Sequence, residues 1–108
     1  LLHDTVVLMF GANSAFTKGQ LERELKRIGM EKQIFLVTTT TSKTWRDDVN
    51  AVYEAISEKY SNVHVLDWNE YSKDQDWFYS HKSYVTEVGA HEEALFFAKK
   101  IYETLRGN

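Results

Sequence analysis

The chain has 108 residues, 43% of them hydrophobic and 27% charged, which is enough for one compact core and too short for two domains. Its net charge is −3, and Lys and Arg are scattered among Asp and Glu, which argues against nucleic acid or a membrane surface as the partner. The absence of Cys excludes disulfides and thiolate metal sites. We therefore expect one soluble domain over residues 1–108.

The first predicted strand covers residues 4–10, DTVVLMF. This run is continuous, apolar and rich in β-branched residues, and it ends at Gly11, which is typical of a strand buried on both faces of a parallel sheet. Thr17 and Gln20 then have the spacing of a capping box, and an apolar stripe predicts a helix that ends at Gly29. Together these segments predict one βα unit.

The same pattern continues along the chain. QIFLVT at 33–38 predicts a second strand, a helix is expected from about Trp45, and NVHVLDW at 62–68 predicts a third strand. A final helix is predicted to bury the face formed by Ala90, Ala94, Leu95, Ala98, Ile101, Tyr102 and Leu105. Alternating strands and helices of these lengths predict an α/β fold with a parallel sheet and right-handed crossovers.

The strand at 4–10 raises a physical difficulty. It is as apolar as a central strand, yet no earlier element of this sequence can cover its outer edge. An uncovered strand of this kind promotes aggregation. We therefore expect an upstream βα unit or a partner chain to cover it, and we expect the chain to be the later part of a longer domain.

Polar residues cluster after the predicted strands. Ligands of open α/β sheets bind beyond the carboxyl ends of the strands, so the segments of interest are 11–16, 38–44, 67–72 and 79–84. Gly11 and Asn13 could direct polar N–H groups toward a developing oxyanion, although a simple turn is the commoner use of both residue types. The Thr run offers hydroxyls without a base nearby in sequence, and Asp67 is predicted to be a capping carboxylate rather than a general base.

The segment HEEAL at 91–95 begins like a zinc-protease helix. That motif requires a second His at the position that Leu95 occupies. We predict no metal and no cofactor for this chain.

A resemblance to a known family joins these segments. VVLMFGANSAFT, IFLVTTTTSKTWRDDVN, NVHVLDWNEYS and DWFYSHKSYVTEVGAHEEALFFAKKI, in this order, resemble the later two-thirds of an SGNH (GDSL-type) esterase domain. They are most similar to the extracellular domain of peptidoglycan O-acetyltransferases. The resemblance implies a flavodoxin-like three-layer sandwich that lacks its first βα unit, and chemistry through an acyl-Ser intermediate.

The same resemblance implies partners and a location. The expected partner is an acylated carbohydrate or an acyl donor, and a membrane is involved only through an unseen region before Leu1. The implied location is the outer face of the cell membrane or the cell surface, while composition alone leaves the cytoplasm open.

The resemblance also assigns site residues. Asn13 corresponds to the oxyanion-hole amide, and the nucleophilic Ser block would lie upstream of Leu1. The family has an Asp-x-x-His pair whose two positions fall here on His81 and Tyr84. A phenol has an ordinary pKa of about 10, too high for a base at neutral pH.

Flanking residues fix that register. Trp77-Phe78 precedes the pair and Thr86 with Gly89 follows it, at the spacing of the family pattern. The favoured hypothesis is therefore a catalytically degenerate domain that acts on or binds O-acylated cell-wall polysaccharide. Two alternatives stay open: an active O-acetyltransferase or esterase with Ser supplied upstream and His81 or another His as base, and an unrelated flavodoxin-like interaction module.

Overall fold

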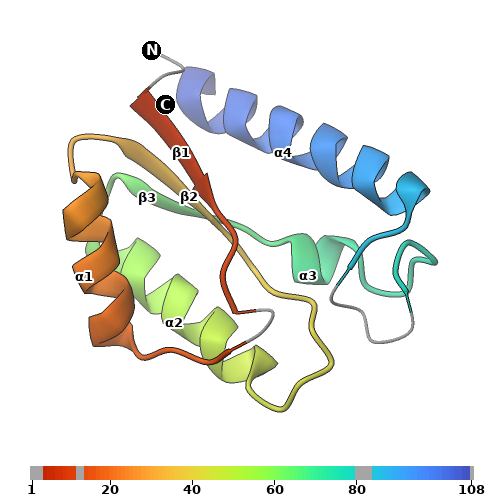
Figure 1. Ribbon diagram of the computed structural model, residues 1–108. Coiled ribbons are helices and arrows are strands. Elements are labelled where there is room, and N and C mark those ends of the chain that lie inside the picture. Colours follow the sequence, from red (N-terminus) through yellow and green to blue (C-terminus); the bar gives the residue numbers. More distant parts are fainter. Residues whose placement is uncertain (1–3, 12–13, 80–83, 108) are drawn as a thin grey trace.

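The computed structural model describes residues 4–11, 14–79 and 84–107, which form a flavodoxin-like three-layer α/β sandwich (Figure 1). Three parallel strands lie in chain order: β1 (Thr5–Leu8), β2 (Gln33–Val37) and β3 (Val63–Leu66). Val7 pairs with Phe35, which pairs in turn with His64. The predicted parallel α/β arrangement is confirmed.

Two helices cover one face of the sheet, α1 (Lys18–Ile28) and α2 (Arg46–Lys59). The capping box of α1 is present: Gln20 N–H donates to Thr17 Oγ1 at 3.2 Å, and Thr17 N–H donates to Gln20 Oε1 at 2.8 Å. Two successive crossovers of the same hand place both helices on the same face. This core layer consists of Leu21, Leu25, Ile34, Leu36, Val49, Tyr53, Ile56 and Val63.

The long helix α4 (Glu87–Gly107) lies on the opposite face, and the short helix α3 (Trp68–Tyr71) follows directly beyond the end of β3 (Figure 1). Phe35 and Val37 point to this side, where they pack with Leu66, Trp68 and Phe96. Within the described ranges, none of the helices combines the length and hydropathy of a membrane span.

The predicted buried face of α4 was wrong except for Ile101, which packs on the sheet side as expected. Phe96, Phe97 and Ile101 contact the sheet side, whereas Leu95 and Tyr102 are 54% and 63% exposed. Ala90, Ala94 and Ala98 are exposed too. The helix carries two apolar stripes, and the stripe with two Phe rings packs inward because aromatic side chains bury the larger area against Trp68.

Strand β1 lies at one edge of the sheet that the described residues form. Contrary to the expectation of burial on both faces, Val7 is 39% exposed, and Met9, just beyond the strand, is 58% exposed. A strand with one neighbour shields fewer of its side chains than a central strand. The expectation that another segment covers this edge stays a prediction.

A carboxylate on α1 links the two helices of the first layer. Lys59 Nζ lies 2.7 Å from Glu22 Oε2, and the Tyr60 hydroxyl donates to the same oxygen at 2.6 Å. These hydrogen bonds, that of Lys59 foremost, lower the pKa of Glu22 to about 2. Because the folded pKa lies below the ordinary value of 4.5, the contacts stabilise the fold above about pH 4.5 and lose that effect as the pH falls toward 2.

We therefore expect Glu22→Gln to flatten the loss of stability on acidification. Urea denaturation between pH 2 and 6 measures it, with Glu31→Gln on an exposed turn as the control. If stability falls as steeply on acidification in Glu22→Gln as in the unchanged chain, the result would contradict this role of Glu22.

Candidate functional site

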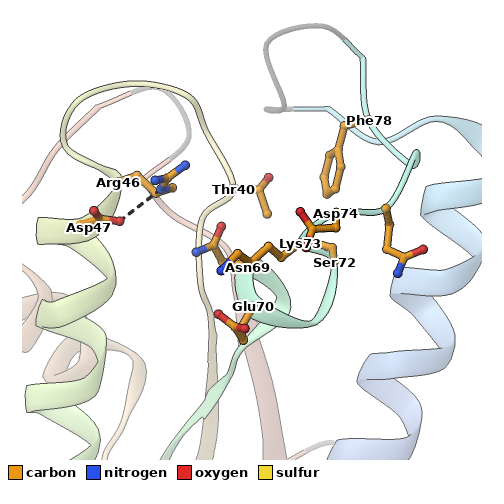
Figure 2. A pocket seen from close by; sticks show the side chains of 10 residues that line it. Thr40, Arg46, Asp47, Asn69, Glu70, Ser72, Lys73, Asp74 and Phe78 are labelled. Atoms are coloured by element: carbon orange, nitrogen blue, oxygen red, sulfur yellow. Dashed lines mark hydrogen bonds and ion pairs between the residues drawn. The ribbon is translucent and has the colours of Figure 1, made fainter.

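Two neighbouring cavities lie beyond the carboxyl ends of the strands. The apolar cavity, of about 220 Å³, is lined among others by Met9, Phe10, Thr40, Phe78, Tyr84 and Glu93. The polar cavity, of about 280 Å³, is lined among others by Thr40, Arg46, Asn69, Lys73, Asp74 and Phe78 (Figure 2). Thr40 and Phe78 line both cavities, so the two lie side by side and together make up the candidate site.

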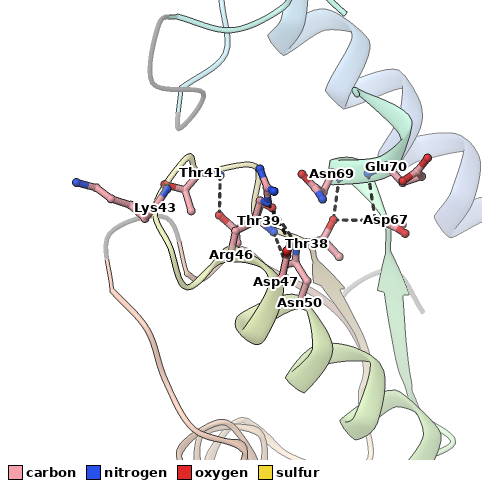
Figure 3. Close-up of polar contacts among 10 residues, drawn as sticks. All are labelled: Thr38, Thr39, Thr41, Lys43, Arg46, Asp47, Asn50, Asp67, Asn69 and Glu70. Carbon is pink, nitrogen blue, oxygen red and sulfur yellow. Dashed lines mark hydrogen bonds and ion pairs between the residues drawn. The ribbon is translucent and has the colours of Figure 1, made fainter. Parts of the chain in front are cut away.

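The Thr run that follows β2 is held by hydrogen bonds on both sides (Figure 3). Thr39 N–H donates to Asn50 Oδ1 at 2.8 Å, and Asn50 Nδ2 donates back to the Thr39 carbonyl at 3.1 Å. On the other side, Asn69 N–H donates to Thr38 Oγ1 at 2.8 Å. These contacts fix the end of β2 and thereby the position of Thr40 between the two cavities.

Asp67 has the capping role that the sequence predicts. Its side chain accepts a hydrogen bond from Glu70 N–H at 3.2 Å at the start of α3, and a second one from Thr38 Oγ1 at 3.2 Å (Figure 3). A carboxylate engaged in this way stabilises the loop after β3 and is not placed in either of the two cavities described above.

The turn after β1 is equally constrained. The Tyr53 hydroxyl donates to the Phe10 carbonyl at 2.9 Å and accepts from Phe10 N–H at 3.1 Å, and Trp45 Nε1–H donates to the Gly11 carbonyl at 2.8 Å. Burial raises the pKa of Tyr53 to about 12, which keeps this hydroxyl protonated. Gly11 has φ +92°, and a Cβ there would lie 2.7 Å from Val49 Cγ1. The turn therefore requires Gly at this position.

The two arms of the 77–86 loop are joined directly. Thr86 N–H and its hydroxyl both donate to the Trp77 carbonyl, at 2.7 and 3.1 Å, and Gly89 N–H donates to Thr86 Oγ1 at 3.2 Å. Phe78 and Val85 form an antiparallel bridge. The residues that fixed the sequence register thus contact one another at the start of α4.

Of the three predicted site residues, Tyr84 alone lies within the residues that the structure describes. Tyr84 is 56% exposed and lines the apolar cavity, and its carbonyl accepts from Tyr79 N–H at 3.0 Å. Asn13 and His81 lie outside the described residues. Within the part of the chain that the structure describes, no three His, Asp or Glu side chains group as a metal site.

Glu93 is a site residue that the sequence analysis missed. It is half-buried on the inner face of α4, it lines the apolar cavity, and burial raises its pKa above the ordinary value. One signal could have found it: Glu93 precedes Phe96 and Phe97 by three and four residues, so it shares the aromatic stripe of the helix.

The raised pKa of Glu93 predicts the direction in which the stability of the fold changes with pH. A carboxyl whose folded pKa exceeds its unfolded pKa contributes full stability below the unfolded value, and that contribution is lost as the pH rises through the folded value. We expect Glu93→Gln to unfold at a higher temperature than the unchanged chain at pH 7.5 and at the same temperature near pH 4, by calorimetry. Glu22→Gln should show the opposite pH dependence, and a shared trend in both variants would contradict the assignment.

Comparison with known proteins finds similarity to several proteins that carry the same kind of name. No protein-family profile matches the chain. A Staphylococcus aureus (strain MSSA476) protein named "Putative O-acetyltransferase SAS0844" is 34% identical over 90 residues, which cover 83% of this chain and 14% of that protein. The O-acetyltransferase OatA of S. aureus (strain NCTC 8325 / PS 47) is 34% identical over 88 residues, 82% of this chain and 13% of the relative.

The aligned segment therefore spans about one seventh of the length of the curated relatives that the chain matches. The similarity confirms the resemblance to O-acetyltransferases, while the assignment to the SGNH group stays a prediction. Over most of its length, the chain is similar to a segment of proteins named as O-acetyltransferases.

Proposed function

We propose that this domain recognises O-acylated cell-wall polysaccharide at the cell surface and does not turn over the ester. The observation that carries the proposal is the pair of cavities that share Thr40 and Phe78. An acylated sugar combines a small apolar group with a polar ring, and an apolar cavity beside a polar one suits both parts. At about 220 and 280 Å³, each cavity alone lies below the usual range of small-molecule sites, roughly 300–1,000 Å³, so an acylated sugar would have to occupy both.

The apolar cavity suits the acyl group. Met9, Phe10 and Phe78 contribute apolar surface there, and Glu93 adds a polar group that can contact an ester. Tyr84 also lines this cavity.

The polar cavity suits the sugar. Asn69 and Gln75 supply neutral donors and acceptors, and Lys73 and Asp74 supply charged ones (Figure 2). Sugar hydroxyls both donate and accept, so a mixed lining of this kind can satisfy several of them at once. The ring of Phe78 offers an apolar face at the border with the acyl cavity.

Absence of turnover follows from the acid–base pair that the resemblance assigns. A general base works best with a pKa near the operating pH. The family position for that base holds Tyr84, a phenol, and the position of its orienting carboxylate holds His81. The proposal is therefore a recognition site with the shape of a catalytic site and without its base.

Exchange of Phe78 tests the binding site. We expect Phe78→Ala to weaken binding of an O-acetylated saccharide about tenfold or more, equivalent to about 1.4 kcal/mol, in calorimetric titrations. Tyr79→Ala is the matched control, because Tyr79 is 59% exposed and lines neither cavity as described above. Equal losses in both variants would place the ligand elsewhere.

A second candidate is an active O-acetyltransferase or esterase, and the similarity to proteins named as O-acetyltransferases favours it. A segment before residue 1 would then supply Ser, and His81 would act as base. p-Nitrophenyl acetate distinguishes the candidates when it is offered to the longest form in which the chain occurs, with and without His81→Ala. Turnover that His81→Ala abolishes favours the enzyme, and no turnover in either form favours recognition.

The same similarity, over most of the chain, argues against an unrelated interaction module.

We further propose that a strand from an upstream segment, or from a partner chain, covers β1. Thr5–Leu8 pairs with β2 on one side, and its other edge has no strand beside it among the described residues. Unpaired strand edges promote association. Val7→Lys should reduce concentration-dependent light scattering of the 108-residue chain, and scattering equal to that of the unchanged chain would count against an open edge.

A further inference from the structure

The outward face of α4 carries a regular repeat that is apolar at every position except His91. Its members follow one another at alternating spacings of three and four residues, which is the heptad pattern of helices that pair side by side. We name it the α4 seam, and it consists of Val88, His91, Leu95, Ala98, Tyr102 and Leu105.

The seam is not used by the fold that the structure describes. Val88 is 60% exposed, Leu95 is 54% exposed and Tyr102 is 63% exposed. The stripe of α4 that packs on the sheet side contains Phe96, Phe97 and Ile101 instead, and α4 forms the outer layer there (Figure 1). Exposed apolar side chains in one continuous line mark an interaction surface more often than isolated ones do.

Charges on α4 specify the direction of a pairing helix. Beside the seam, the first half of the helix carries Glu87 and Glu92 and the second half carries Lys99 and Arg106, while Glu103 forms an ion pair with Lys100. A second copy of α4 in parallel would set acid beside acid and base beside base. An antiparallel copy sets acid beside base at both ends, and it also opposes the two helix dipoles.

We propose that a second copy of this chain binds the α4 seam in antiparallel orientation and forms a two-fold symmetric dimer. The heptad spacing then brings Leu95 opposite the partner's Ala98, and Val88 opposite the partner's Leu105. Glu92 lies beside the partner's Lys99 on the flank of the seam. Such a contact is isologous, because the same surface serves both copies, and small Ala98 at its centre allows the helices to approach closely.

Cysteine cross-linking tests the orientation, since the chain has no Cys of its own. Val88 and Leu105 are 17 positions apart, which is about 26 Å along a helix. A mixture of Val88→Cys and Leu105→Cys chains should form a mixed disulfide dimer under mild oxidation, while each variant alone should not cross-link. Cross-linking of Val88→Cys alone would indicate a parallel pair and overturn the proposal, as would no mixed dimer.

Charge exchange tests the interface in solution. Glu92→Lys or Lys99→Glu alone should weaken dimerisation about tenfold or more in sedimentation experiments, and the double exchange should restore it. All chains carry Val7→Lys, so that association through β1 does not contribute, and circular dichroism checks their folding. A contact of one helix pair is small, so we expect dimers at concentrations on the order of 10–100 μM.

Two results would overturn the proposal here. One is a monomer at about 1 mM in the chain that carries Val7→Lys alone, which would leave the seam without a second copy. The other is a chain that stays monomeric but sediments with anionic phospholipid vesicles unless Leu95→Glu is present, which would assign the seam to a lipid surface.

Discussion

Replacing Trp68 by alanine is expected to destabilise the domain by about 3–5 kcal/mol, a large part of the stability of a chain of this size. Trp68 is 2% exposed and stacks on Trp77, with ring centroids 5.6 Å apart and an interplanar angle of 8°. Its ring also lies 5.8 Å from Phe96. The side chain therefore joins α3, the 77–86 loop and α4, and its removal leaves a cavity among all three.

Urea denaturation of Trp68→Ala measures this effect, with Tyr79→Ala as the exposed aromatic control. Because Trp68→Ala is expected to fold poorly at 37 °C, Trp68→Phe serves as a milder variant that keeps part of the ring contact. We expect the order of stability to be unchanged chain, Trp68→Phe, Trp68→Ala. A loss below about 1 kcal/mol in Trp68→Ala would contradict the described packing.

The second large effect is expected from Gly89→Ala. A Cβ at Gly89 would lie 2.8 Å from Trp77 Cβ and 3.0 Å from Val85 Cβ, and it would press on the Trp77 carbonyl as well. Backbone atoms of the loop cannot yield as a flexible side chain does, so α4 and the 77–86 loop must separate. We expect a loss of about 2 kcal/mol, after the gain in helix propensity is included, together with weaker ligand binding.

The matched control is Gly19→Ala. Gly19 also lies in a helix, in α1, but a Cβ there would meet nothing within 4 Å. The helix propensity of Ala then acts alone, and we expect a gain of about 0.5–1 kcal/mol. Thermal unfolding of the two variants should shift in opposite directions, and a shift of both in the same direction would show that contact with the loop does not determine the effect at Gly89.

Local sequence patterns predicted the elements of the first layer and the capping of α1. The box of Thr17 and Gln20 could be predicted because it depends on residues three apart, within one turn of helix. Asp67 as a cap could be predicted for the same reason. Thr86 and Trp77 contact each other at the position that the family register implies, although nine residues separate them.

Features that depend on packing between distant segments could not be predicted. The final helix has two apolar stripes, and the sequence alone does not say which one meets Trp68, which is 28 residues before Phe96. Glu93 was missed because its half-burial depends on the end of β2 lying opposite α4. The exposure of Val7 likewise depends on which strand lies beside β1.

The most direct test of the central claim compares one peptidoglycan saccharide in its O-acetylated and de-O-acetylated forms. Each is titrated into the 108-residue chain by calorimetry, while acetate released from the ester is measured in the same samples. We predict that the acetylated form binds at least about tenfold more tightly, a difference of about 1.4 kcal/mol, and that no acetate is released above the rate without protein. Equal affinity for the two forms, or protein-dependent release of acetate, would contradict a recognition site without turnover.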